Sequence, residues 1–326
     1  MIKRFIAAIA GFVLLGLIIA LIHGSGSYKQ VHEEKVRAGD ISIVQNAAFY
    51  YAVDRGLFQE EGLDVEVVKF DSPKQVVDAV VLNQVDFGGT GSAAGISAIA
   101  ESNSPSVLKY YSLLCMGENG EEGNHLLVKK GSLITSINQL EGKKIGFLPG
   151  PQWKTIVKKI LSNNGVKLEN TSLIELPAQL QLASLSSGAI DALISLEPVG
   201  TIALENGVAS VLESSPANKN IASPFCGGAG IISAKFLKER PEAAKKVLKA
   251  MKKAVDGYNQ KKPPGILVKF LKVDEKIAPK VQVSKAVFYT DLTEAEKIAS
   301  QKFLDLFFDE KVMPRRVIVE DVLVNG

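Results

Sequence analysis

The chain has 326 residues, enough for about two domains, and its 46% hydrophobic and 22% charged residues are an ordinary globular balance. The formal charge is +3 at pH 7, and Lys3 and Arg4 supply two of the positive charges. The rest of the chain is therefore nearly neutral and lacks the excess of basic residues expected of a nucleic-acid-binding protein. Two cysteines and three histidines exclude a disulfide scaffold and a zinc ribbon, and we expect neither a metal site nor a cofactor.

The N-terminal segment is the most apolar part of the chain. Residues 5–22 are an uncharged run of 18 residues, just long enough to span a bilayer. Lys3 and Arg4 should stay in the cytoplasm, which places everything after Ile22 outside. We predict a signal anchor or a signal peptide over residues 1–28, with cleavage left open, and a polar tether over residues 29–39.

Short apolar runs then alternate with amphipathic helical patterns, which predicts an α/β fold with mostly parallel strands. Ser72 and Pro73 are typical of an N-cap and a first helical position. A glycine-rich loop is expected over residues 88–91. The first half is predicted to contain strands at 41–45, 63–70, 85–87 and 108–115, and helices at 47–58, 73–82 and up to residue 100.

A second run of the same kind follows a polar break at residues 117–123. It is predicted to contain strands at 126–128, 144–148, 173–176 and 192–195, and helical segments at 137–140, 153–163 and 178–187. A strand at 229–233 then precedes helices at 241–258, 266–271 and 294–308. Two similar β-α-β-α runs in series indicate two α/β units.

Four segments carry motifs in a constant order. They are AVDRGLFQEEGLDVE at 52–66, VDFGGTG at 85–91, INQLEGKKIG at 137–146, and GAIDA at 188–192 followed by Glu197-Pro198. Together they resemble the family of solute-binding proteins for nitrate, sulfonate, taurine and thiamine-pyrimidine-type ligands, and the resemblance covers about residues 41–250. The chain is identified on this basis as a member of that family.

The resemblance implies a two-lobed periplasmic-binding-protein fold of type II, with the ligand between the lobes and hinge closure around it. Lobe one would comprise residues 40–122 and 228–326, and lobe two residues 123–227. The implied function is that of an extracytoplasmic binding protein that delivers a small polar ligand (a sulfonate, nitrate, taurine, or a related anion or heterocycle) to an ABC permease and its ATPase. We expect a monomer without enzymatic activity, held at the membrane by residues 5–22 or secreted.

Ligands of open α/β sheets bind at the carboxyl ends of the strands, next to helix N-termini. The candidate ligand-binding residues are therefore Gln45, Asn46, Tyr50, Asp71, Gly89, Thr90, Gly91, Ser92, Gln152, Trp153 and Glu197. The glycines would let the backbone approach an anion, and Thr90 and Ser92 would donate hydroxyl hydrogens. Asn46 is equally explained as a helix cap, and Tyr50 as a core residue. Pro151 lacks an N–H group, and Leu196 replaces a family tryptophan, so the ligand class stays open.

The two cysteines are expected at the hinge. Cys115 lies just before the first chain crossing and Cys226 just before the return strand. A disulfide in an oxidising compartment and two separate buried thiols are both compatible with the sequence.

Three other functions are kept as alternatives. Thiamine-pyrimidine synthases resemble these binding proteins, but they carry a cysteine-rich motif and an active-site histidine that this sequence does not match. Gly89-x-Gly91-x-x-x-Gly95 loosely imitates a dinucleotide-binding loop, although it follows a complete βα unit. A ligand sensor acting through a membrane partner is the third. No catalytic residue is predicted.

Overall fold

The computed structural model describes residues 34–117 and 123–324. The predicted membrane segment at 5–22 lies outside these residues. Within the described part, no helix has both the length and the apolar character needed to cross a membrane.

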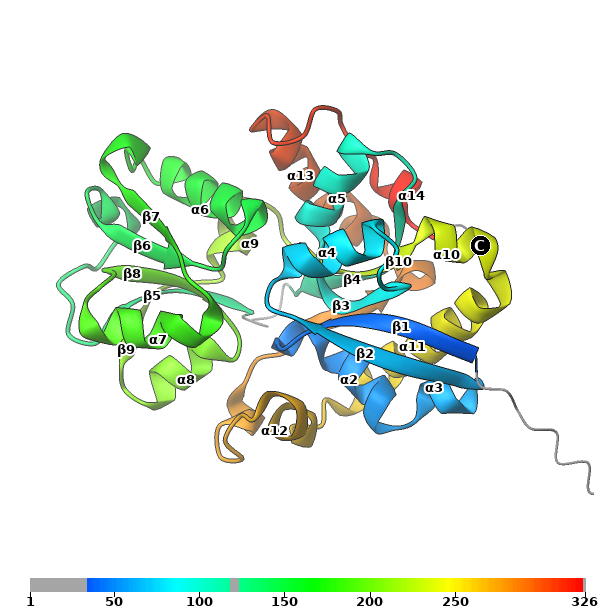
Figure 1. The fold of residues 1–326 in the computed structure, drawn as a ribbon. Helices are drawn as coiled ribbons and strands as arrows, with labels where there is room; N and C mark the ends of the chain where they lie inside the picture. The colour runs from blue at the N-terminus through cyan, green and yellow to red at the C-terminus, as the bar shows by residue number, and fades with distance from the viewer. Residues whose placement is uncertain (1–33, 118–122, 325–326) are drawn as a thin grey trace, which may run out of the picture. The chain divides into compact units, whose positions relative to one another are not determined.

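The first sheet has six strands in the order β11-β4-β10-β3-β1-β2 (Figure 1). β1 is parallel to β2 and β3, whereas β10 enters antiparallel between β3 and β4. The strands are β1 (Glu34–Ile41), β2 (Leu63–Phe70), β3 (Phe87–Ala93), β4 (Leu108–Met116), β10 (Phe225–Ser233) and β11 (Lys285–Phe288).

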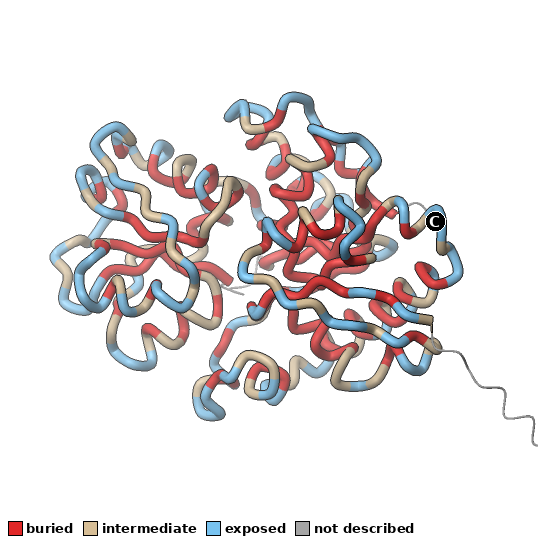
Figure 2. Tube along the Cα trace, viewed as in Figure 1, coloured by how far each residue is buried: buried red, intermediate tan, exposed pale blue. Residues whose placement is uncertain are grey.

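Helices cover both faces of this sheet, whose inner strands are buried in Figure 2, while the edge strand β2 is largely exposed. One face packs against α2 (Ala47–Asp54), α3 (Leu57–Glu60), α11 (Pro241–Lys261) and α12 (Gly265–Leu271). The other packs against α4 (Pro73–Val81), α5 (Ala94–Asn103) and α13 (Glu294–Asp309). The short helices α10 (Ala234–Glu239) and α14 (Val319–Val322) complete this unit, which we call lobe 1.

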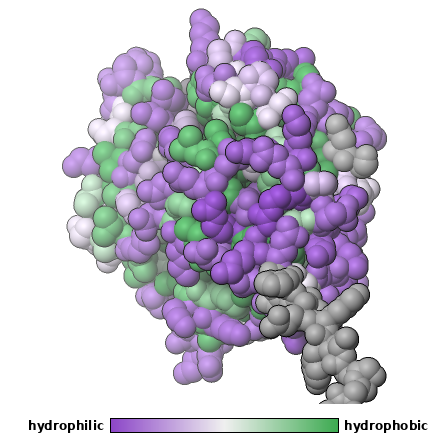
Figure 3. Space-filling model, turned by 45° about the vertical axis from the view of Figure 1, so that its right-hand side comes forward, coloured by the Kyte–Doolittle hydropathy of each residue, from purple (hydrophilic) through white to green (hydrophobic). Residues whose placement is uncertain are grey.

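The second sheet has five strands in the order β7-β6-β8-β5-β9, and we call it and its helices lobe 2. The strands are β5 (Asn124–Lys129), β6 (Lys144–Phe147), β7 (Ser172–Glu175), β8 (Ala192–Leu196) and β9 (Ala209–Ser214). Its helices are α6 (Pro151–Asn163), α7 (Ala178–Ser187), α8 (Val199–Glu205) and α9 (Pro216–Asn220). Lobe 2 is one continuous stretch of chain inserted between β4 and β10. The face of the molecule seen in Figure 3 is mostly hydrophilic, with hydrophobic residues in scattered patches.

A disulfide joins the two strands at which the chain enters and leaves lobe 2. Cys115 near the end of β4 is bonded to Cys226 at the start of β10, and their Cα atoms are 4.0 Å apart. Of the two alternatives for these cysteines, the structure has the disulfide. Because both strands belong to the first sheet, the disulfide fixes the spacing of the two crossings on the lobe 1 side.

The predicted α/β fold is confirmed, but the start of lobe 1 was misplaced. Residues 34–39, predicted as part of a tether, form most of β1, and residues 44–46 form a 3-10 turn instead of the end of a strand. Val36 and Ala38 are buried on one side of β1, while Lys35 and Arg37 alternate with them. These flanking charges made an amphipathic strand resemble a polar tether.

Three further boundaries differ from the predictions. The helix expected at 47–58 breaks into α2 and α3 at Gly56, which has a left-handed φ of 66°. The glycine-rich segment is part of β3 and not a loop after it. β10 begins at Phe225, so lobe 1 resumes before residue 228.

Candidate functional site

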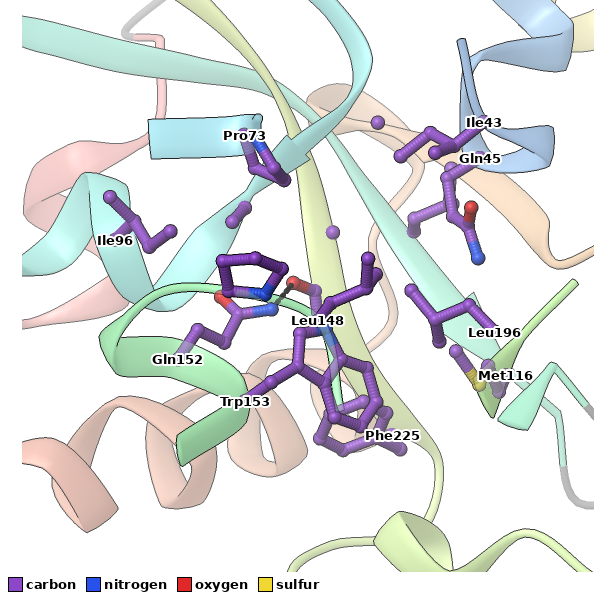
Figure 4. A pocket seen from close by; sticks show the side chains of 16 residues that line it. Ile43, Gln45, Pro73, Ile96, Met116, Leu148, Gln152, Trp153, Leu196 and Phe225 are labelled. Carbon is purple, nitrogen blue, oxygen red and sulfur yellow. Dashed lines mark hydrogen bonds between the residues drawn. The ribbon is translucent and has the colours of Figure 1, made fainter. Parts of the chain in front are cut away.

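A pocket lies where elements of both lobes meet, with an empty volume of about 530 Å³ including the solvent at its mouth (Figure 4). The lobe 1 wall comes from the turn after β1, from β3 and α5, and from the ends of β4 and β10 that face the crossings. The lobe 2 wall comes from the β6–α6 loop, the first turn of α6 and the end of β8. The site is therefore at the carboxyl ends of several strands, as expected for this fold class.

The wall of this pocket is mostly apolar. Its apolar side chains include those of Ile43, Met116, Leu148, Trp153 and Phe225. Its polar side-chain groups are two amides, those of Gln45 and Gln152, and the indole N–H of Trp153, and no described residue that lines it carries a charge.

Gln45 lies in the 3-10 turn that follows β1, and only 8% of its surface is exposed. Its Oε1 atom is buried and has no hydrogen-bond partner. Figure 4 shows its amide among the lining side chains, directed toward Leu196. An unpaired buried acceptor costs free energy in the empty protein, so this amide is poised to accept a hydrogen bond from a ligand.

Gln152 connects the two lobes. It is the second residue of α6 in lobe 2, where Pro151 occupies the first helical position. Its Oε1 accepts a hydrogen bond of 2.7 Å from the N–H of Gly95 at the start of α5, and its Nε2 donates one of 3.0 Å to the carbonyl of Gly227 in β10. Because both partners belong to lobe 1, we call this pair of bonds the Gln152 bridge.

Trp153 follows in the same helical turn and supplies the widest aromatic surface of the pocket. It is 6% exposed, and its ring centroid lies 6.5 Å from that of Phe225 in a tilted arrangement. An aromatic surface beside Leu148 and Met116 suits a flat, apolar ligand body.

Asn46 and Tyr50, both expected in the site, are occupied inside lobe 1. Asn46 Nδ2 donates to Asp40 Oδ1 at 2.8 Å, and its Oδ1 accepts from the N–H of Gly91 at 2.6 Å. The Tyr50 hydroxyl donates to the same Asp40 oxygen at 2.9 Å. Burial, with the charge of Asp40 in support, raises the pKa of Tyr50. Neither side chain lines the pocket. Asn46 links β3 to the turn after β1, and Tyr50 is bonded to the end of β1.

The glycine-rich strand contributes backbone, and its hydroxyl groups point elsewhere. Gly91 lines the pocket, whereas Gly89 faces Asn46, where an added Cβ would lie 2.5 Å from Oδ1. The Thr90 hydroxyl donates to the carbonyl of Gln45 at 2.7 Å, and the Ser92 hydroxyl donates to the carbonyl of Gly89 at 3.0 Å. The donors expected to hold an anion are thus used within the protein.

The two candidate carboxylates lie away from the pocket. Asp71 is exposed just before α4. Glu197 is 2% exposed, and its Oε1 lies 3.0 Å from the hydroxyl of Thr201 and 3.1 Å from Nε2 of His125. Its neighbour Leu196 lines the pocket instead.

Most of the lining residues were not among the candidates, including Ile43, Pro73, Ile96, Met116, Leu148 and Phe225. Met116 ends β4 and Leu148 directly follows β6, so a search of strand ends that ignored polarity would have found both. Among the described residues there is no group of three or more His, Cys, Asp or Glu placed to hold a metal ion.

Residues 44–263 match the family described as NMT1/THI5 like. A Bacillus subtilis (strain 168) protein named as an aliphatic sulfonates-binding protein is 23% identical over 328 residues, covering 97% of this chain and 94% of that protein. The Saccharomyces cerevisiae 4-amino-5-hydroxymethyl-2-methylpyrimidine phosphate synthase THI13 is 29% identical over 218 residues, 64% of this chain and 61% of the synthase.

The fold is similar to that of the alkanesulfonate-binding protein SsuA from Xanthomonas axonopodis pv. citri, solved bound to MOPS. The TM-score is 0.72 at 17% sequence identity, and the match covers 90% of this chain and 98% of that one. This likeness confirms the two-lobed binding-protein fold.

Proposed function

The chain belongs to the NMT1/THI5-like family, and from this premise we propose that it is the extracytoplasmic solute-binding component of an ABC importer. The observation that carries the proposal is the pocket built from both lobes and crossed by the Gln152 bridge. A ligand in this position contacts both lobes at once, so its binding favours the arrangement in which they are closed together.

The names of the relatives support this role, because the Bacillus subtilis and Xanthomonas axonopodis proteins are both named for binding sulfonates. We propose that lobe 2 rotates on the two crossings beside the Cys115–Cys226 disulfide, and that the closed, liganded form docks on a permease with its ATPase. The protein acts as a monomer outside the cytoplasmic membrane, anchored through residues 5–22 or released from it.

An enzyme on the same fold is the alternative raised by the yeast synthase. The chemistry of the pocket favours binding over catalysis. The described residues that line it include no serine, threonine, tyrosine, cysteine, histidine, lysine or carboxylate, and both cysteines of the chain are in the disulfide. A nucleophile or general base would have to come from one of those side-chain types.

The test is ligand-dependent thermal unfolding of the full chain in detergent against sulfonates, taurine, nitrate, and neutral heterocycles. A ligand at about 100 times its Kd should add about 2.7 kcal/mol to the free energy of unfolding. Trp153 is the single tryptophan of the chain and lines the pocket, so its emission should change at the same ligand concentrations. Chemical turnover of a bound compound, followed by mass spectrometry, would refute the binding role in favour of the enzyme.

A further inference from the structure

The pocket is suited to an uncharged organic molecule by the chemistry of its walls. The described lining side chains are apolar apart from two amides and the indole N–H of Trp153, and none bears a charge. A nitrate or sulfonate group in such surroundings would lose its hydration and gain no opposite charge in return.

Neutral hydrogen-bond donors could compensate an anion, but four of those near the site are already used. The N–H of Gly91 donates to Asn46 and the N–H of Gly95 donates to Gln152. The hydroxyl groups of β3 donate to backbone carbonyls at 2.7 and 3.0 Å. Recruiting them for an anion would break bonds that hold β3 and the Gln152 bridge in place.

Gln45 is the lining amide that remains for a ligand. Its side chain is more than nine-tenths buried, and its Oε1 has no partner, whereas the amide of Gln152 is paired at both ends. The Thr90 hydroxyl bonds to the backbone carbonyl of Gln45, which holds this residue in position. An amide presents an acceptor and a donor side by side, so its complement is a ligand edge that carries an N–H next to a C=O or a ring nitrogen.

We propose that the ligand is an uncharged, largely apolar ring compound whose lactam-like edge binds the Gln45 amide while its flat body packs against Trp153. This inference rests on the proposed binding function and specifies its ligand class. Gln45 belongs to lobe 1 and Trp153 to lobe 2, so one rigid molecule of this kind contacts both walls (Figure 4). Gln45 then selects for the hydrogen-bonding edge, and Trp153 selects for the planar body.

Three probes of similar size separate charge from hydrogen bonding: 2-quinolinone, 1-methyl-2-quinolinone and naphthalene-2-sulfonate. Each is titrated into the full chain in detergent while the emission of Trp153 is recorded. We expect 2-quinolinone to bind most tightly. The N-methyl compound should bind about tenfold more weakly because it leaves the buried Gln45 acceptor unpaired, and the sulfonate should bind more weakly still.

The variant Gln45→Leu provides the residue-level test. It removes an unpaired buried amide and keeps a similar volume, so the protein should remain folded and still respond to both quinolinones. The tenfold preference for 2-quinolinone over 1-methyl-2-quinolinone should fall to about onefold. Gln282→Leu, at an exposed glutamine, is the matched control and should keep the preference.

Three outcomes overturn this inference: tightest binding of the sulfonate, an unchanged preference in Gln45→Leu, or no response to any of the three probes. Each leaves the binding function to be judged separately by the thermal-unfolding panel. A sulfonate that stabilises the protein in that panel would support the binding function while refuting the ligand class.

Discussion

Replacing Gln152 by leucine tests whether the Gln152 bridge holds the lobes together. Leucine fills a similar volume at the start of α6 but cannot form either hydrogen bond, of 2.7 and 3.0 Å. Each contributes about 0.5–1.5 kcal/mol net, so the closed arrangement should lose about 1–3 kcal/mol relative to the separated one. That corresponds to a change of about 5- to 150-fold in the equilibrium between them.

The lobe separation can be measured by pulsed electron resonance between spin labels on Ser104→Cys in lobe 1 and Ser162→Cys in lobe 2, both exposed positions. The native cysteines are bonded to each other and will not take up label. In Gln152→Leu we expect the distances between the two labels to be longer and more broadly distributed. The ligand affinity should weaken by a factor comparable to the change in the equilibrium between the closed and separated arrangements. Lys154→Leu, exposed on the same helix, should change neither. Unchanged distances in Gln152→Leu would refute the idea that the bridge restrains the lobes.

Three other predictions concern stability. Reducing the disulfide removes a cross-link between residues 111 positions apart and should lower the free energy of unfolding by about 2–4 kcal/mol, seen as a lower urea midpoint; an equal midpoint with and without reductant would contradict this. A hydrogen bond from Arg316 lowers the pKa of Asp305, so this pair stabilises the fold near neutral pH, and the stabilisation is lost as pH falls through the lowered pKa. Between neutral pH and about pH 3, the urea midpoint of Asp305→Asn should therefore fall less than that of the wild type. An equal fall in the two proteins would count against the pair. Gly95→Ala places a Cβ 2.4 Å from the ring of Phe307 and should cost about 1–3 kcal/mol, whereas Gly265→Ala meets open space and should be nearly neutral in thermal unfolding.

Local patterns in the sequence were sufficient for most of the fold. The cap at Ser72 is present as predicted, with its hydroxyl accepting from the N–H of Gln75 and Pro73 at the first helical position. Such signals lie within a few residues of one another and need no tertiary information. β1 could not be placed in the same way, because charged residues alternate with its apolar ones and its partner β2, with which it pairs along its whole length, is distant in sequence.

The site was harder to predict because its chemistry depends on which way neighbouring residues point. Gln45 and Asn46 carry equivalent amides on adjacent positions, yet one lines the pocket and the other is bonded to Asp40 inside lobe 1. The 3-10 turn determines this division, and nothing in the local sequence predicted a turn there. Most of the side chains predicted for the site are also polar, whereas most of the wall is made by apolar residues, some of them at strand ends such as Met116.

The insertion of lobe 2 between β4 and β10 affects the order in which the chain can become complete. Lobe 2 is contiguous, so all of its strands exist once residues 124–214 have been synthesised. Lobe 1 is divided, and β10 belongs between β3 and β4. Until β10 emerges, these two strands have exposed edges, and such edges invite pairing with other chains. A nascent or truncated chain that ends before Phe225 should therefore aggregate readily, and oxidation of Cys115 with Cys226 would report that the central sheet has closed.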